Sequence, residues 1–218
     1  MVKRTKVICT TVGPYAKYGS NLVKACVENY THYCDLAGEV QWIRKMIDKY
    51  HVIAKSNNVK IVNCCGFDSI PSDMGVYFMH KESIKVNMTI KKIEMRVAGA
   101  IGGISGGTYE SLSNVNKEAL KDKNIFKTVI DPYGLNPVGE QEGPDRYDLR
   151  KVIYDKTSQN WIGPFIMAAI NTKIVRRSNA LSGYSYGKEF EYDEATLGGK
   201  GFKGRLKSIL MSIHIAIV

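Results

Sequence analysis

The spacing of hydrophobic residues predicts alternating strands and helices over the first third of the chain. Short runs predict strands at 7–12, 32–36 and 59–65, the first and third of them rich in β-branched residues, and a glycine closely follows each run as a turn signal. Apolar residues at helical spacing predict helices at 20–27 and 39–56. Because this rhythm is typical of parallel strands joined by helical crossovers, we expect an α/β fold.

A different pattern begins after residue 83. Residues 86–97 alternate between polar and apolar side chains, which predicts a half-exposed antiparallel strand of another sheet. Beyond it we expect a helix over 109–121, a long loop over 122–150, a helix over 162–174 and a strand at 190–192. For the helix that begins after Gly66, the expected buried side chains are Met74, Tyr77 and Phe78.

The composition narrows the classes of partner. The 218 residues carry a formal net charge of +10, but their Lys and Arg residues are spread out, and only residues 200–207 form a basic cluster. Because no zinc-finger or RNA-recognition motif accompanies that cluster, we expect no nucleic-acid partner. The cysteines form no CxxC pair and the histidines show no HxxxH spacing, so no metal site is expected. The first apolar run is too short for a signal peptide, so we expect the chain on the cytoplasmic side.

Candidate chemistry lies where the three predicted strands end. Ligands of open parallel sheets bind at the carboxyl ends of the strands, and here those ends lead into residues 11–15, 36–39 and 66–73. Glycines there allow close approach of backbone to a ligand, and helix starts offer free N–H groups. Each segment also has a plain structural explanation as a turn, a helix start or a helix cap. The residue types alone leave both explanations open.

The order of these motifs resembles one protein family. TVGPYAKYG, ACVENYTHYCDLAGE and NCCGFDSIPSDMG, followed by GGTYES and PFIMAAINTKIVRRSNAL, resemble saccharopine-dehydrogenase-like oxidoreductases, in the branch that contains trans-acting enoyl reductases of lipid biosynthesis. The resemblance implies a Rossmann domain with an inserted α+β substrate domain, and hydride transfer from NAD(P)H to a lipid-like small molecule. The cofactor-binding residues that it implies are Val12, Gly13, Pro14, Tyr15, Gly38, Glu39, Gly66, Phe67, Asp68 and Ser69.

Tyr15 and Asp68 are the candidates for a catalytic proton donor. Either side chain could meet a developing negative charge near the hydride acceptor. Packing for Tyr15 and helix capping for Asp68 are the alternatives, and the sequence leaves them open.

One part of a dinucleotide site is missing from the sequence. A GxGxxG or GxxGxxG motif opens such a site, and only six residues precede the first predicted strand. The stretch 99–107 (GAIGGISGG) fits that spacing poorly, and we interpret it as a substrate-domain loop. We therefore expect residues 1–83 to be the C-terminal half of a Rossmann domain, a partial parallel sheet without its first half. Residues 84–199 would be the α+β substrate domain and 200–218 a basic, apolar tail. The chain is then truncated at both ends, and NAD(P)H binds to the complete protein but not to this chain.

The tail and the missing motif leave three functions open. Leu206, Ile209, Leu210, Ile213 and Ile217 form an apolar helical stripe behind the basic cluster. That pattern is typical of a helix on a membrane or lipid-droplet surface, and also of an ordinary packed helix. The alternatives are an oxidoreductase that is active in its complete form, a non-catalytic binding module, and a peripheral protein at acidic lipid surfaces. A homo-oligomer also stays open, because the unpaired apolar strand at 7–12 invites pairing with a partner.

Overall fold

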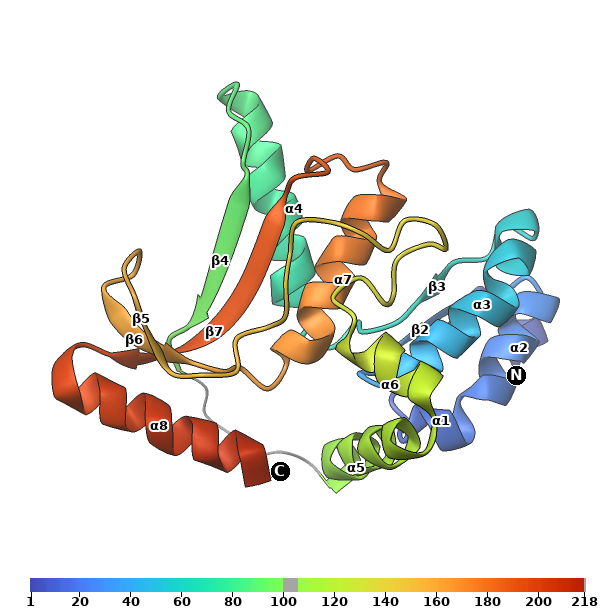
Figure 1. Ribbon diagram of the computed structural model, residues 1–218. Coiled ribbons are helices and arrows are strands. Elements are labelled where there is room, and N and C mark those ends of the chain that lie inside the picture. Colours follow the sequence, from blue (N-terminus) through green and yellow to red (C-terminus); the bar gives the residue numbers. More distant parts are fainter. Residues whose placement is uncertain (100–105, 218) are drawn as a thin grey trace. The chain divides into compact units, whose positions relative to one another are not determined.

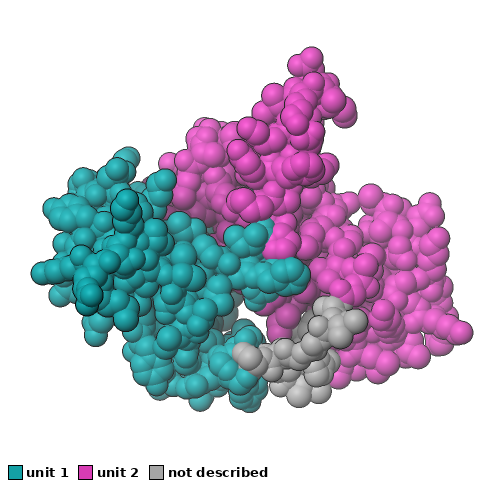
Figure 2. Space-filling view, turned by 180° about the vertical axis from the view of Figure 1, so that it is seen from behind, with its two compact units in different colours: residues 1–70, 104–135 teal, residues 71–103, 136–218 magenta. Residues whose placement is uncertain are grey.

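The chain folds into two sheets with helices packed on them, which confirms the predicted α/β class. The computed structural model describes residues 1–99 and 106–217, with side chains as far as residue 213. One sheet has three parallel strands and the other has four strands of mixed direction (Figure 1). The chain divides into two compact units, unit 1 (1–70 and 104–135) and unit 2 (71–103 and 136–218), coloured separately in Figure 2. The predicted domain limits at residues 83 and 199 stay predictions.

Unit 1 holds the parallel sheet, in the strand order β1-β2-β3. Val7 of the first strand is opposite His32 of the second, and Tyr33 is opposite Ile61 of the third, so the predicted parallel arrangement of these three strands is confirmed. The elements of unit 1 are η1 (Val2–Arg4), β1 (Val7–Thr10), α1 (Tyr15–Tyr18), α2 (Ser20–Glu28), β2 (His32–Asp35), α3 (Val40–Ser56), β3 (Ile61–Val62), α5 (Gly106–Lys121) and α6 (Lys123–Ile130).

The helix α3 shows how the apolar pattern builds unit 1. Apolar residues at helical spacing are buried at Val40, Ile43, Tyr50 and Ala54, and Trp42 and Met46 widen the buried face. The Trp42 ring lies 5.6 Å from that of Tyr15, and its Nε1 donates to Ser20 Oγ at 3.0 Å. Asn58, with φ at 54°, follows the helix in the left-handed region, where helices commonly end. The helix thereby holds the segment after β1 in place.

Unit 2 contains the mixed sheet, in the order β4-β7-β6-β5. Its core is a cluster of Val76, Val175, Tyr186, Phe190 and Tyr192, against which Ile90, Ile93 and Met95 pack. The elements of unit 2 are α4 (Ile70–Lys85, whose first residue belongs to unit 1), β4 (Lys92–Val97), β5 (Ile153–Asp155), β6 (Asn160–Gly163), α7 (Ala168–Leu181), β7 (Glu191–Gly199) and α8 (Gly201–Ile217).

Several predictions for this half of the chain are wrong. The strand predicted at 86–97 is β4, which pairs parallel with β7 and not antiparallel, because alternation reports half-burial and says nothing of a partner's direction. The predicted loop at 122–150 begins with α6, whose N-cap is Asp122: its Oδ1 accepts from Asn124 N at 2.8 Å. The predicted helix at 162–174 begins only at Ala168, since β6 runs to Gly163 and Pro164 follows it.

The buried face predicted for α4 is also wrong. Met74, Tyr77 and Phe78 are exposed, and the buried residues are Ser72, Val76 and Ser83. The buried face of this helix carries small side chains, and Ser72 belongs to a buried hydrogen-bonded group. A rule that buries the largest apolar residues fails on such a helix.

Candidate active site

The segments that follow β1, β2 and β3 come together at the carboxyl edge of the parallel sheet. The hydroxyl of Tyr15 donates to Thr10 O at 3.1 Å and accepts from Leu36 N at 3.2 Å, which joins the first two segments. The amide of Cys65 donates to Asp35 O at 2.7 Å, which joins the third. We call the accessible part of this edge the strand-end surface; its exposed residues are Val12, Gly13, Leu36, Gly38, Phe67 and Asp68.

Glu39 lies beneath this surface and fixes the segment after β1. Its side chain is buried, with Oε1 accepting from Tyr15 N at 2.6 Å and Oε2 accepting from Ala16 N at 3.0 Å. Oε1 also accepts from Ser111 Oγ of α5 at 3.0 Å. Charged acceptors at a helix start satisfy N–H groups that have no partner within the helix. The carboxylate of Glu39 therefore ties α1 to α5 and to the loop after β2.

Asp35, at the end of β2, is the second buried acid of the site. Its Oδ2 accepts from Tyr33 Oη at 2.9 Å and from Asn63 Nδ2 at 2.7 Å, and its Oδ1 accepts from Ala37 N at 2.9 Å and Cys64 N at 3.2 Å. Burial raises the pKa of Asp35, although these four hydrogen bonds favour the charged form. The side chain holds the loops after β2 and β3 in one arrangement.

The predicted site residues divide into an exposed and a buried group. Val12, Gly13, Gly38, Phe67 and Asp68 are exposed, with Phe67 at 90%. The buried residues among those predicted are Pro14, Tyr15, Glu39, Gly66 and Ser69. The exposed group is therefore the part of the site that a ligand can reach, while the buried group supports it. Burial also raises the pKa of the Tyr15 phenol.

Sequence reasoning missed Asp35, Asn63 and Ser111. Asp35 stands at the end of an apolar strand, where a carboxylate is a signal that could have been used. Ser111 had no local signal, since its partner Glu39 lies 72 residues away. It does belong to GGTYES, one of the motifs that carry the family resemblance, and in the same motif Glu110 forms an ion pair with Lys17 at 2.6 Å. The structure thus brings four of those motifs together. The glycine-rich stretch 99–107, interpreted above as a substrate-domain loop, lies largely outside the described residues.

The strand-end surface offers groups that suit the nicotinamide end of a dinucleotide. Backbone is accessible at Gly13 and Gly38, and Val12, Leu36 and Phe67 present apolar surface on which a flat ring can lie. The two buried acids, Glu39 and Asp35, lie beneath this surface and accept the hydrogen bonds described above. Two hollows, of about 410 Å³ beside α3 and α6 and about 240 Å³ beside Arg176, are lined by none of the predicted site residues.

Unit 2 has a buried polar group of its own, joining α4, α7 and β7. Asn171 Nδ2 donates to Ser72 Oγ and to Glu194 Oε2, at 3.1 Å each, and Tyr192 Oη donates to Glu194 Oε1 at 2.7 Å. All four side chains are buried. Because its members are buried and bonded to one another, this group serves as an internal frame of unit 2.

Curated proteins named trans-acting enoyl reductase match most of this chain. A trans-acting enoyl reductase of Mycobacterium ulcerans (strain Agy99) is 36% identical over 230 residues, which cover 99% of this chain and 54% of that protein. Trans-acting enoyl reductases of Mycobacterium tuberculosis (strain ATCC 25618 / H37Rv) and Mycobacterium bovis (strain BCG / Pasteur 1173P2) are each 36% identical over 214 residues, 92% of this chain and 50% of the relative. The chain spans about half the length of the curated relatives it matches. No family model matches the sequence, and no solved structure matches it.

Proposed function

We propose that this chain is part of an NAD(P)-dependent reductase of the saccharopine-dehydrogenase-like family that reduces an enoyl group of a lipid-like substrate. The observation that carries the proposal is the identity of 36% to trans-acting enoyl reductases over nearly the whole chain. A second support is the strand-end surface, where the motifs of the resemblance converge. The activity, substrate and cofactor proposed belong to the whole protein.

The proposed chemistry is the addition of a hydride and a proton across a carbon–carbon double bond. The nicotinamide of NAD(P)H, when bound, would supply the hydride for one alkene carbon together with the two electrons of the reduction. The other alkene carbon takes a proton. Val12, Gly13, Gly38 and Phe67 would hold the nicotinamide end, and Glu39 with Asp35 would keep their loops in position.

Of the two candidate proton donors, Asp68 is the one that a substrate can reach. Its side chain is exposed on the strand-end surface, whereas the Tyr15 hydroxyl is buried between Thr10 O and Leu36 N. We therefore assign proton transfer to Asp68 in this proposal. Tyr15 is assigned a positioning role, because its hydroxyl joins the ends of β1 and β2.

The test measures oxidation of NADPH and of NADH by the natural, full-length protein, with a 2-enoyl thioester as substrate. We expect substrate-dependent oxidation, and formation of the saturated thioester in equal amount. Asp68→Asn should lower kcat about 10²- to 10⁴-fold and leave the Kd of the nicotinamide cofactor unchanged. The control is Asp48→Asn on α3, an exposed aspartate paired with Arg44 on the same helix, which should keep full activity.

Two results would count against the proposal. Absence of nicotinamide binding by the full-length protein would favour the non-catalytic alternative. If the Asp68→Asn variant bound the cofactor and kept full activity, the proposed reductase activity would stand, but Asp68 would not be the proton donor.

A further inference from the structure

The helix α8 packs against its sheet through small residues. Among its residues 201–213, Gly204 and Ser208 are the buried ones, and they face β6 and β7. A Cβ added to Gly204 would lie 2.1 Å from Gly199 O, and one added to Gly163 would lie 3.1 Å from Ser212 Oγ. The backbones therefore approach so closely that large side chains have no room on this face.

Most of the large apolar residues of α8 as far as Ile213 are exposed, and Met211 is half-buried. The five exposed ones form what we call the outer stripe: Phe202, Leu206, Ile209, Leu210 and Ile213. Phe202 is 78% exposed and Leu210 is 60% exposed. At 100° per residue the five side chains fall within an arc of about 100°. A helix on the surface of a globular protein usually turns such a stripe inward, and α8 does the reverse.

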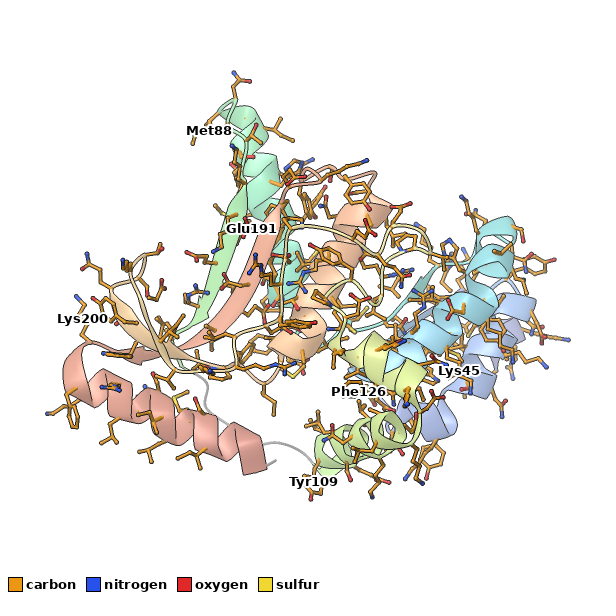
Figure 3. All side chains as sticks on the ribbon, viewed as in Figure 1. Lys45, Met88, Tyr109, Phe126, Glu191 and Lys200 are labelled. Carbon is orange, nitrogen blue, oxygen red and sulfur yellow. The ribbon has the colours of Figure 1, made fainter. Side chains whose placement is uncertain are left out.

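Cations border the outer stripe. Lys203 and Lys207 are exposed along one side of it, and Lys200 precedes the helix (Figure 3). On the other side lies Arg205, whose guanidinium is 5.0 Å from the centre of the Trp161 ring. The sequence from 200 to 218 contains no Asp or Glu. An apolar stripe with a cationic border is complementary to an anionic, apolar surface.

We propose that α8 docks in the plane of an anionic lipid bilayer, with the outer stripe in the boundary between headgroups and acyl chains. Lys203 and Lys207 then lie at the level of the anionic headgroups. A second copy of the chain is a poorer fit, because it would bring the same cations together with no acid on the helix to receive them. Among the described helices none is both long and apolar enough to cross a bilayer, and the proposal needs none. It does not depend on the proposed enzymatic activity.

The test is co-sedimentation of the purified protein with vesicles of phosphatidylcholine mixed with phosphatidylglycerol, and of phosphatidylcholine alone. We expect binding to the mixed vesicles, weakened by added salt. The double variant Leu206→Ser/Leu210→Ser should weaken binding about tenfold or more, because it removes apolar area that would be inserted. Lys203→Glu/Lys207→Glu should weaken binding to the mixed vesicles by a similar factor.

Matched controls come from α3, in the other unit. Val52→Ser/Ile53→Ser also removes two exposed apolar side chains, and Lys45→Glu/Lys49→Glu also reverses two exposed charges. Both variants should bind as the unchanged protein does. Phe202→Trp provides a readout that keeps an apolar side chain in the stripe, and its emission should shift to the blue when mixed vesicles are added.

Three results would overturn the proposal. One is equal binding to both vesicle types, and another is undiminished binding of the Leu206→Ser/Leu210→Ser variant. The third is an unshifted Phe202→Trp emission together with a concentration-dependent molar mass that the serine variant abolishes. That result would assign the stripe to self-association.

Discussion

A buried carboxylate makes the free energy of unfolding depend on pH, and Glu194 in unit 2 is such a group. Burial raises the pKa of Glu194 above its ordinary value of 4.5, although hydrogen bonds with Ser72, Tyr192 and Asn171 favour the charged form; Asp148 adds to the rise. Because the folded state then binds the proton more tightly than the unfolded chain, the contribution of Glu194 to the free energy of unfolding falls as the pH rises from about 4.5 through the raised pKa. Glu194→Gln removes this contribution.

We expect the free energy of unfolding of the Glu194→Gln variant to decline less steeply above about pH 4.5 than that of the unchanged protein. Urea midpoints across this range measure the slope. The control is Glu189→Gln, an exposed residue just before β7, which should keep the original slope. Equal slopes for Glu194→Gln and the unchanged protein would show that Glu194 does not titrate in this range.

The sequence predicted which residues gather at the strand-end surface better than it predicted what they do. Gly13, Gly38 and Asp68 are accessible, and each lies in one of the three segments that the sequence motifs indicated. Glu39 belonged to the same motifs, but its contacts with Tyr15 and Ser111 span 24 and 72 residues of sequence. Burial and hydrogen-bond partners are set by the tertiary fold, so local pattern cannot separate a supporting residue from an accessible one. The assignments of cofactor contact stay predictions.

Among the elements, local periodicity was reliable where one face of a helix or strand meets one core. The strands β1 and β2 and the helix α3 begin and end within a few residues of their predicted limits. The pattern failed for α4, and α8 shows why. In both helices the buried face carries small residues, so the largest apolar side chains are not the buried ones. The direction of β4 could not be predicted either, because its partner β7 lies about a hundred residues further along the chain.

The close contact between α8 and β7 can be tested at Gly204. A Cβ there would meet the carbonyl of Gly199, so Gly204→Ala forces the helix away from the strand. Alanine favours a helix over glycine by about 1 kcal/mol, whereas overpacking against backbone costs about 1–3 kcal/mol. At so short a contact we expect the second effect to dominate and the free energy of unfolding to fall, as urea unfolding would show.

The matched control is Gly75→Ala in α4, where an added Cβ meets nothing within 4 Å. This variant should gain up to about 1 kcal/mol from helix propensity alone. If both alanine variants were stabilised, α8 would not be held to β7 in the way the structure shows.

At the scale of the whole molecule, the chain contains two cores and one tryptophan in each unit. Trp42 is buried against Tyr15 in unit 1, and Trp161 packs on Tyr154 in unit 2. The sequence has only these two tryptophans. The single-tryptophan variants Trp42→Phe and Trp161→Phe therefore report unfolding of one unit each. The sequence pattern could not supply this division, because each unit combines segments that are far apart in the chain.

We expect the two units to unfold as separate cooperative bodies. Val175→Ala removes a fully buried side chain from the core of unit 2 and should lower its stability by about 2 kcal/mol. It should lower the urea midpoint reported by Trp161 and leave the midpoint reported by Trp42 unchanged. Val23→Ala, at an equally buried position of unit 1, should do the opposite. If either substitution moved both midpoints equally, the whole chain would unfold as one cooperative body despite its two cores.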